Sequence, residues 1–370
     1  QEIDEIAQRI AGDIGRGGLP VATAIAPAAD PPVDQGLGIF PTIDEAVRAA
    51  AVAQPQFVRL KLEVRARIIV AMRRAMLENG DALAKAAWEE TGLGRYEDKV
   101  VKNRLVTEKT PGLEELAPVA TTGDHGLTLV EPAPFGVIGA ITPVTNPTST
   151  IICNSIGMLA AGNSVVFNVH PFAKNCCIQT IALLNKAIVA AGGPANVITG
   201  VSNPTIESAQ ALMKHPSVRL VVVTGGADGV KVAMQSGKRA ICAGPGNPPA
   251  VVDETADIDK AARDIILGAS TDNNIICTDE KETIAVASIA DRLIASMGNQ
   301  GGVVIPRERV DELKRVIFEE IRGPRQKAKL NKSLIGKNAS VILGKMGISA
   351  GDSVRLVVAE VPEDDPLLWT

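Results

Sequence analysis

The chain has 370 residues, of which 46% are hydrophobic and 22% are charged, as is ordinary for a globular enzyme with two domains. Its formal net charge of −4 and the lack of a basic stripe with interleaved aromatic residues argue against a nucleic-acid binder. Aromatic residues make up only 2%, so Val, Ile, Leu and Ala must fill the cores, which favours a parallel sheet buried between helices.

Residues 2–14 predict a short amphipathic helix, because Ile3, Ile6 and Ile10 recur at helical spacing and form one apolar face. A helix of this length is marginal in isolation, so it is expected to dock on another surface. Residues 15–38 are rich in Gly, Pro and Ala, which predicts a flexible linker between this helix and the folded body. The alternative is a tail that packs back on its own domain.

The body begins near residue 41 with predicted helices. Thr42 and Glu45 have the spacing of a capping box, and the apolar pattern behind them continues as an amphipathic helix to about residue 79. Two further helices are predicted over residues 81–91 and 96–108.

Strands and helices alternate beyond residue 126, which predicts an α/β fold with a doubly wound parallel sheet. Ligands of such sheets lie at the carboxyl ends of the strands. The predicted strands cover 127–131, 136–141, 164–169, 196–199, 218–223 and 239–243, and the predicted helices cover 148–160, 173–190, 205–214 and 228–235. A second α/β unit is predicted from residue 250, with a strand at 250–253, a helix at 257–268 and further patterned segments at 286–297, 301–305, 309–321 and 354–359.

No formally charged residue occurs between Pro132 and Ala173, as in a membrane segment. Asn146, Asn154 and several prolines and glycines interrupt the stretch, however, so a buried strand, helix and strand explain it better. The charged residues in the N-terminal helix argue against a secretory signal. The 5 cysteines lack CxxC spacing, which favours a reduced chain without a disulfide framework or a metal site.

Three loops follow predicted strands and are candidates for ligand binding. Residues 141–147 precede a predicted helix, whose N-terminus suits an anion. Residues 222–229 contain glycines that allow close approach of the backbone to a phosphate, and residues 170–174 form the third loop. None contains the GxGxxG fingerprint of dinucleotide sites, so the loops indicate either a nucleotide cleft or plain turns.

Cys277 is the candidate nucleophile. It follows the paired amides Asn273 and Asn274, and a thiol in such a polar setting can attack an electrophile covalently. The glycine-rich turn at 242–249 contains neither carboxylate nor imidazole, so this chemistry would have to proceed without a local general base. Composition alone favours a buried structural thiol instead.

The motifs, taken in order, resemble the aldehyde dehydrogenase superfamily over about residues 41–370. The resemblance lies in EPAPFGVIGAITP at 131–143, AGNSVV at 161–166, VTG at 223–225 and the cysteine at 277. Within the superfamily, four motifs are similar to the CoA-acylating propionaldehyde dehydrogenases of bacterial microcompartments: PVTNP at 143–147, VHP at 169–171, AGPGN at 243–247 and NNIIC at 273–277.

This resemblance implies that Cys277 attacks a short aliphatic aldehyde, that the hydride passes to NAD, and that coenzyme A releases the thioester as acyl-CoA. A free thiol is only a few per cent ionised at neutral pH, so nearby dipoles or charges would have to favour the thiolate. Asp279 and Glu280 are expected to point away. Hydrolytic relatives carry a Glu-Leu-Gly-Gly motif whose glutamate activates water, whereas this chain has Ala243-Gly-Pro-Gly246. Thiolysis by CoA is therefore expected to prevail over hydrolysis.

The oxyanion donor is left open by a departure from the Pro-Trp-Asn motif of hydrolytic members. An ungapped match places Thr145 at the asparagine position and Asn146 one residue later, so Thr145, Asn146 and the amide of Cys277 are all candidates. The Lys-Pro pair that holds the adenosine ribose becomes His170-Pro171. The resemblance implies cofactor contacts at Thr142, Pro143, His170, Pro171, Gly200, Thr224, Gly225, Gly226 and Gly244.

The resemblance also implies a domain plan and partners. Residues 39–249 would form a Rossmann-like nucleotide-binding domain with an oligomerisation hairpin at 121–134, and residues 250–370 a catalytic domain that is incomplete at its C-terminus. Residues 1–14 would be a targeting helix that binds a microcompartment shell protein in the bacterial cytoplasm, and the chain would form a dimer or tetramer. Two alternatives remain: a phosphate-dependent semialdehyde dehydrogenase and a catalytically silent assembly protein.

Overall fold

The structure, a computed structural model, describes residues 37–370, which divide into two compact units. Unit 1 comprises residues 37–91 and 99–245, and unit 2 comprises residues 92–98 and 246–370. The predicted helix at 2–14 and nearly all of the predicted linker lie outside the described residues. Within residues 37–370, no helix is both long and apolar enough to cross a membrane.

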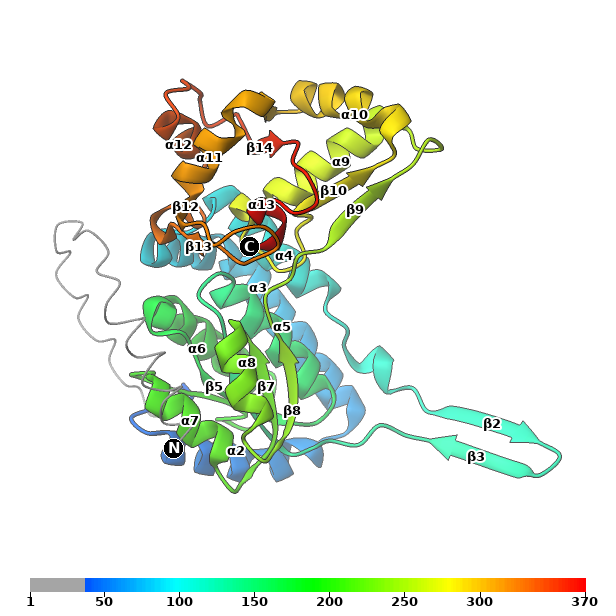
Figure 1. Cartoon of the computed structure of the whole chain (residues 1–370). Helices are drawn as coiled ribbons and strands as arrows, with labels where there is room; N and C mark the ends of the chain where they lie inside the picture. The colour runs from blue at the N-terminus through cyan, green and yellow to red at the C-terminus, as the bar shows by residue number, and fades with distance from the viewer. Residues whose placement is uncertain (1–36) are drawn as a thin grey trace. The chain divides into compact units, whose positions relative to one another are not determined.

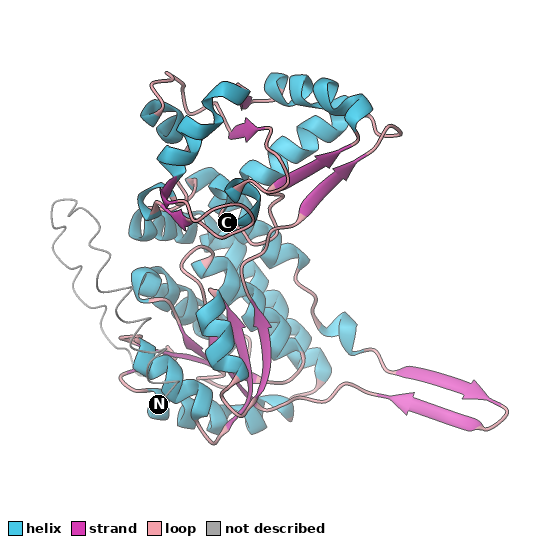
Figure 2. Ribbon diagram, in the orientation of Figure 1, coloured by secondary structure: helices cyan, strands magenta, loops and turns pink. Residues whose placement is uncertain are grey.

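Unit 1 is built on a six-stranded parallel sheet in the order β1-β6-β5-β4-β7-β8 (Figures 1 and 2). The strands are β1 (Ile39–Phe40), β4 (Val137–Ile141), β5 (Ser164–Asn168), β6 (Ile198–Val201), β7 (Val218–Thr224) and β8 (Arg239–Ala243). Since the chain adds β5 and β6 on one side of β4 and then returns to add β7 and β8 on the other, the prediction of a doubly wound sheet is confirmed. The charge-free stretch is the buried β4, α5 (Pro147–Ala160) and β5.

Helices cover both faces of this sheet. The core on one face contains buried residues of α3 (Leu62–Thr91), α5 and α6 (Lys174–Ala190), while the core on the other contains those of α2 (Ile43–Val58), α7 (Ile206–Lys214) and α8 (Ala227–Met234). Leu184 and Leu212, one from each core, are 0% exposed. Full burial of such a side chain stabilises the fold by about 1.5–3 kcal/mol. α4 (Tyr96–Lys109) begins in unit 2 and ends in unit 1.

The long N-terminal helices confirm one prediction and correct another. The capping box is present, with the Glu45 amide donating to Thr42 Oγ1 at 3.3 Å. The predicted helix end near residue 79 is wrong, because α3 continues through Gly80 and the break falls between Val58 and Leu62. Gly80 is buried and its carbonyl accepts a hydrogen bond from Asn103 Nδ2 at 3.2 Å, so tertiary packing overrides the weak helix propensity of glycine.

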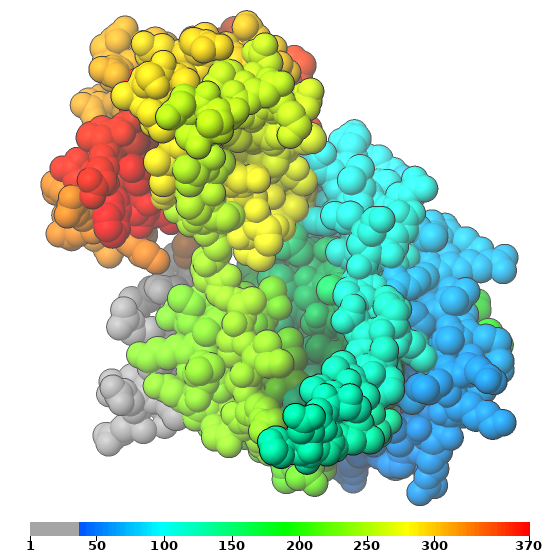
Figure 3. Space-filling model, turned by 90° about the vertical axis from the view of Figure 1, so that its right-hand side faces the viewer, coloured from blue at the N-terminus to red at the C-terminus, as the bar shows by residue number. Residues whose placement is uncertain are grey.

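A two-stranded antiparallel hairpin stands away from the rest of unit 1 (Figure 1). Its strands are β2 (Val119–Gly123) and β3 (Gly126–Val130), and every residue in both strands is exposed. Figure 3 views the molecule from the side on which this hairpin projects. The predicted hairpin at 121–134 is therefore present, with strands that begin two residues earlier and end at residue 130.

Unit 2 contains three separate pairs of strands. β9 (Pro249–Val252) pairs in parallel with β10 (Glu282–Ala285), and β11 (Gly302–Ile305) pairs in parallel with β14 (Leu356–Ala359). The segment at 309–321 divides into α11 (Val310–Ile317) and β12 (Phe318–Glu320), because the buried Phe318 adopts an extended backbone and starts an antiparallel pair with β13 (Lys329–Leu330). The remaining helices are α9 (Ile258–Ser270), α10 (Ala287–Asn299), α12 (Ala339–Lys345) and α13 (Pro366–Trp369), and the short 3-10 turns of both units are Leu113–Leu116, Pro171–Ala173, Thr271–Asn274, Arg307–Arg309 and Lys332–Leu334.

Candidate active site

The topological switch point of the unit 1 sheet lies between β4 and β7. These strands are neighbours and Ile141 is in register with Val223, so the loops that follow them leave the same edge of the sheet. Ligands of doubly wound sheets bind at this position. The fold therefore brings together most of the predicted residues of unit 1: Thr142, Pro143, Thr145, Asn146, Thr224, Gly225 and Gly226.

Asn146 is oriented by a lysine that the sequence analysis missed. Lys102 is 8% exposed, and its Nζ donates to Asn146 Oδ1 at 2.7 Å and to the Thr145 carbonyl at 3.4 Å. An ammonium group can only donate, so the amide oxygen must face Lys102 and Nδ2 becomes the group that Asn146 offers as a donor. Asn146 Nδ2 in turn donates to Thr145 Oγ1 at 3.2 Å. This arrangement favours the Asn146 amide over the Thr145 hydroxyl as an oxyanion donor.

A sequence signal for Lys102 existed. On α4, the buried face carries Lys99, Lys102 and Asn103 at i, i+3 and i+4, where an ordinary surface helix places apolar residues. Asn103 connects this face to the same loop, because its Oδ1 accepts a hydrogen bond from Thr148 Oγ1 at 2.8 Å. Polar residues at positions i, i+3 and i+4, where a helix would normally bury apolar residues, indicate that the helix supports a polar site.

Thr142 and the glycines after β7 fit a bound cofactor. Thr142 is 3% exposed, and its Oγ1 has no hydrogen-bond partner within the part of the chain that the structure describes. Buried hydroxyl groups are normally satisfied, so this one is suited to a ligand. A Cβ added at Gly225 or Gly226 would meet nothing within 4 Å, which leaves room above the backbone at the start of α8 for a phosphate.

His170 follows β5 and is a neutral donor in this setting. Its Nδ1 accepts a hydrogen bond from the Phe172 amide at 3.2 Å, which places the proton of the neutral ring on Nε2. Burial lowers the pKa of His170. The lysine of the superfamily that the motifs resemble would supply a charge at this position, whereas His170 beside Pro171 would supply a neutral N–H group.

Gly200 differs from the other predicted cofactor residues because it lies inside a strand rather than at the end of one or after it. Gly200 lies within β6, where an added Cβ would approach Ile181 Cδ1 at 3.0 Å and the Phe167 carbonyl at 3.3 Å. Its small size therefore serves the packing of the strand, and its contact with a cofactor stays a prediction. Gly244 directly follows β8, where an added Cβ would make only an ordinary 3.9 Å contact with Val230.

Cys277 in unit 2 follows an unusual backbone turn between α9 and β10. Asp272, Asn273 and Asn274 have φ values of 49°, 57° and 63°, so three consecutive non-glycine residues are left-handed. A left-handed helical conformation costs roughly 1–2 kcal/mol per residue, and Asn and Asp tolerate it best. The sequence Asp-Asn-Asn suits this turn. The Cys277 side chain, three residues after the turn, is half-buried.

Gly246 lies directly against the backbone of Cys277. A Cβ added at Gly246 would lie 1.9 Å from the Cys277 carbonyl oxygen, so no residue with a side chain fits without displacing the nucleophile. The glycine-rich turn thus has a steric role that the sequence analysis did not identify. Such close approach of two backbones is a common reason for a glycine.

Asp279 bonds back to the backbone just before Cys277. Asp279 was expected to point away, but it is 5% exposed and its Oδ2 accepts a hydrogen bond from the Ile276 amide at 3.1 Å. Lys281, which the sequence analysis missed, donates from Nζ to the Ile276 carbonyl at 2.9 Å and to the Asp279 carbonyl at 3.3 Å. Desolvation lowers the pKa of Lys281, and the charge of Asp279 opposes this. A cation is therefore tied to the turn that carries the thiol.

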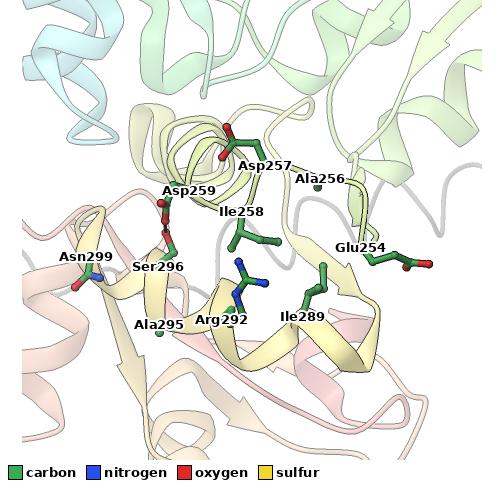
Figure 4. Close-up of a pocket in the computed structure, with 10 residues that line it drawn as sticks. All are labelled: Glu254, Ala256, Asp257, Ile258, Asp259, Ile289, Arg292, Ala295, Ser296 and Asn299. Atoms are coloured by element: carbon green, nitrogen blue, oxygen red, sulfur yellow. Dashed lines mark hydrogen bonds between the residues drawn. The ribbon is translucent and has the colours of Figure 1, made fainter.

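An open hollow of about 620 Å³ lies elsewhere in unit 2, between the start of α9 and α10 (Figure 4). Asp259 and Arg292 are among its lining residues, and Asp259 Oδ1 accepts a hydrogen bond from Ser296 Oγ at 2.7 Å. No residue of the 271–280 turn lines it, so it is separate from the candidate nucleophile. Across residues 37–370, no group of three or more His, Cys, Asp or Glu side chains could hold a metal ion.

Comparisons with known proteins identify the family of the chain. A model of the aldehyde dehydrogenase family matches residues 40–301. The propanal dehydrogenase (CoA-propanoylating) of Salmonella typhimurium is 43% identical over 341 residues, which cover 92% of this chain and 72% of that protein. The propionaldehyde dehydrogenase of Rhodopseudomonas palustris, solved with bound CoA and an acylated cysteine, is 47% identical with a TM-score of 0.84 over 90% of this chain and 75% of that one.

A second solved relative is the propionaldehyde dehydrogenase from the Clostridium phytofermentans fucose utilisation bacterial microcompartment. It is 44% identical and has a TM-score of 0.83 over 90% of this chain and 75% of that one. The family model alone spans more than half of the chain, and the solved relatives share its fold. The chain therefore belongs to the aldehyde dehydrogenase family.

Proposed function

We propose that this chain is an NAD-linked, CoA-acylating aldehyde dehydrogenase that converts short aliphatic aldehydes into acyl-CoA through a thioester on Cys277. The observation that carries this proposal is Cys277 itself, a half-buried thiol that follows a strained turn in the chain and has Gly246 against its backbone. A relative that is 47% identical has an acylated cysteine and bound CoA in its solved structure.

The proposed reaction assigns a role to each group. The Cys277 sulfur attacks the aldehyde carbon, and the Asn146 amide donates to the oxygen that becomes negative. NAD, when bound, accepts the hydride that leaves the same carbon. The sulfur of CoA then attacks the thioester carbon, and the bond to Cys277 breaks. The balanced result is one acyl-CoA, one NADH and one proton for each aldehyde, NAD and CoA consumed.

Thiolysis rather than hydrolysis follows from the sequence at residues 243–247. A hydrolytic enzyme needs a carboxylate to activate water, and Ala243-Gly-Pro-Gly-Asn247 supplies none. The thiol of CoA is intrinsically nucleophilic and depends less on a base. The residues that would hold NAD are Thr142, His170 and the turn from Thr224 to Gly226. The unbonded hydroxyl of Thr142 and the open space above the backbone of Gly225 and Gly226 fit a polar cofactor.

One assay separates this function from its alternatives. Propanal and NAD are supplied with CoA, with phosphate or with neither, and NADH and the acyl product are followed together. We expect acyl-CoA in a one-to-one ratio with NADH, and Cys277→Ala abolishes both whereas the control Cys242→Ala does not. Acyl phosphate as the product would instead identify a phosphate-dependent enzyme. A wild-type protein that shows no turnover with any of these additions would indicate an assembly protein.

We further propose that residues 2–14 bind a shell protein, so that the enzyme lies inside a bacterial microcompartment. Support comes from the isoleucine pattern of these residues and from the microcompartment origin of a relative 44% identical to this chain. Deletion of residues 1–38 is expected to abolish co-purification with shells while CoA-dependent turnover persists. Unchanged co-purification of the deletion variant would refute the docking role.

The exposed hairpin is proposed to join copies of the chain into a dimer or tetramer. Leu127 and Leu129 are 68% and 57% exposed, although both are large and apolar. We expect Leu129→Glu to lower the molecular mass measured by analytical ultracentrifugation. A wild-type chain that sediments as a monomer would exclude this role.

A further inference from the structure

The left-handed turn before Cys277 is held in place by side chains rather than by regular structure. Asp272 is 0% exposed; its amide donates to Asp98 Oδ2 at 2.9 Å, and its Oδ1 accepts from the Arg95 amide at 2.8 Å. Asn273 Oδ1 accepts from Arg95 Nε at 2.7 Å. A strained backbone conformation persists only where several surrounding contacts hold it in place. Here Arg95 and Asp98, both from one distant segment, supply such contacts.

The opposite side of the turn is also bonded. Asn273 Nδ2 donates to the Gly336 carbonyl and to Asn338 Oδ1, both at 2.9 Å. Asn274 Nδ2 donates to the Ala269 carbonyl at 2.6 Å. Every residue of the left-handed turn therefore has at least one side-chain hydrogen bond that would be lost in another backbone conformation.

The segment at residues 92–98 is shaped to fit against the turn. Gly94 has a φ of 75°, and a Cβ at this position would lie 1.8 Å from Asp272 Oδ1, so only glycine fits. The Gly94 amide donates to the Gly336 carbonyl at 2.9 Å, and Lys337 Nζ donates to the Gly92 carbonyl at 2.8 Å. The segment is fixed at several points by unit 2, to which it belongs.

Asp98 is fixed in turn by Arg355. The Arg355 guanidinium donates to Asp98 Oδ2 at 2.7 Å and to the Ser270 carbonyl at 3.3 Å, so one cation holds both the acceptor and the end of α9 that leads into the turn. The Arg95 guanidinium likewise donates to the Asp352 carbonyl at 2.9 Å. Charge-assisted bonds of this kind are the stronger hydrogen bonds in proteins and restrict side-chain geometry.

We propose that Asp98 and Arg95 are positioning residues that fix the turn before Cys277 and thereby set the reactivity of its thiol. The proposal rests on the proposed role of Cys277 as the nucleophile. Neither side chain needs to touch a substrate. A misplacement of about 1 Å at a reacting group can cost about a hundredfold in rate, so the placement of this backbone matters most in a site without a general base.

The test measures the thiol directly, without NAD or aldehyde. Alkylation of Cys277 by iodoacetamide is followed by mass spectrometry of its peptide, since Cys153 and Cys242 are also half-buried rather than fully enclosed. We expect Asp98→Ala to lower the rate at least tenfold, and Asp98→Asn, which keeps an acceptor oxygen, to restore part of it. Arg307→Ala is the control, because it breaks an ion pair with Glu360 on the surface of unit 2.

Steady-state kinetics distinguish positioning from a general loss of structure. We expect kcat with propanal, NAD and CoA to fall with the alkylation rate in Asp98→Ala, while the KM for NAD stays within twofold of wild type. Should Asp98→Ala fail to fold by circular dichroism, Arg95→Lys decides by the same criteria, since it retains the Arg95 amide bond but loses the Nε bond to Asn273.

Two results would overturn the proposal. One is alkylation at the wild-type rate in a folded Asp98 or Arg95 variant, and the other is an equal fall in the Arg307→Ala control. Failure of the proposed function is separable from both, because it shows as wild-type protein that forms no acyl-CoA, whereas alkylation compares the variants independently of turnover.

Discussion

The ammonium nitrogen of Lys102 lies 2.7 Å from the amide oxygen of Asn146, at the edge of the sheet where β4 and β7 end. This contact decides which atom of Asn146 is presented as a donor, because a cation must face the oxygen. A lysine on a buried helix face thus favours Asn146 over Thr145 among the three oxyanion candidates that the sequence left open, and the role of Asn146 as the donor stays a prediction.

Loss of this contact is expected to reduce catalysis. In Lys102→Met the Asn146 amide can rotate, and loss of one oxyanion donor typically costs about 100-fold to 1,000-fold in kcat. We expect a reduction of at least tenfold in kcat for propanal. Lys109→Met, an exposed position on the same helix, is the control and should behave as wild type. Unchanged kcat in a folded Lys102→Met would exclude this role.

Gly246→Ala is expected to inactivate the nucleophile. The new Cβ would lie 1.9 Å from the Cys277 carbonyl, so the backbone of the turn must move. We expect a fall of about a hundredfold in acyl-CoA formation and a loss of about 1–3 kcal/mol in the free energy of unfolding, measured by denaturant titration. Gly344→Ala, on α12 with nothing within 4 Å, should be neutral or slightly stabilising. Activity retained in Gly246→Ala would show that the turn can shift without harm.

Lys281 is expected to assist the thiol through its charge. Its Nζ is bonded to the carbonyl of Ile276, the residue before Cys277, and a nearby cation favours a thiolate. Lys281→Met should lower the alkylation rate of Cys277 several-fold at neutral pH, and the loss should shrink as salt concentration rises. Lys260→Met removes an exposed lysine on α9 that pairs with Asp264, and serves as the control. Equal rates in both variants would indicate that the charge of Lys281 has no effect.

His170 should make the stability of the protein depend on pH. Burial lowers its pKa in the folded state, so protonation favours unfolding. The stability from neutral His170 is fully present above the unfolded pKa of about 6.5 and is lost as pH falls through the lower folded pKa. We expect the wild type to lose stability across this window and His170→Gln to lose less.

A second histidine must be separated from this effect. The pKa of His215 is also lowered, chiefly by burial, so its contribution has the same sign. Denaturation curves from pH 5 to 8 are therefore compared for His170→Gln, His215→Gln and the double variant. A slope that His170→Gln leaves unaltered would assign the pH dependence to His215 or to other groups.

Much of unit 1 could be predicted because its signals are local. The Thr42 capping box and the strand, helix and strand between residues 136 and 169 depend on neighbours in sequence, and the structure confirms them. The predicted break at Gly80 failed because a hydrogen bond from Asn103, on another helix, stabilises the continuous α3. Local propensity is a weak guide wherever tertiary contacts compete with it.

The candidate site likewise combines features that local sequence predicts with features that depend on tertiary contacts. Motifs predict Cys277 and the loops after β4 and β7 as site residues, whereas the burial of Lys102 and the contact between Gly246 and Cys277 arise only on folding. The three left-handed residues could not be inferred from Asp-Asn-Asn alone, because these residue types also occur in many ordinary turns. Their conformation depends on residues about 175 positions earlier in the chain.

Because residues 92–98 belong to unit 2 although unit 1 flanks them on both sides, the unit that carries the thiol is assembled from two pieces of sequence. A chimera joined at residue 245 would combine Cys277 from one parent with Arg95 and Asp98, which hold the turn before it, from the other. Exchanges between relatives should therefore transfer residues 92–98 together with everything after residue 245. Hybrids that omit residues 92–98 should fold but should contain a Cys277 that reacts more slowly than in either parent.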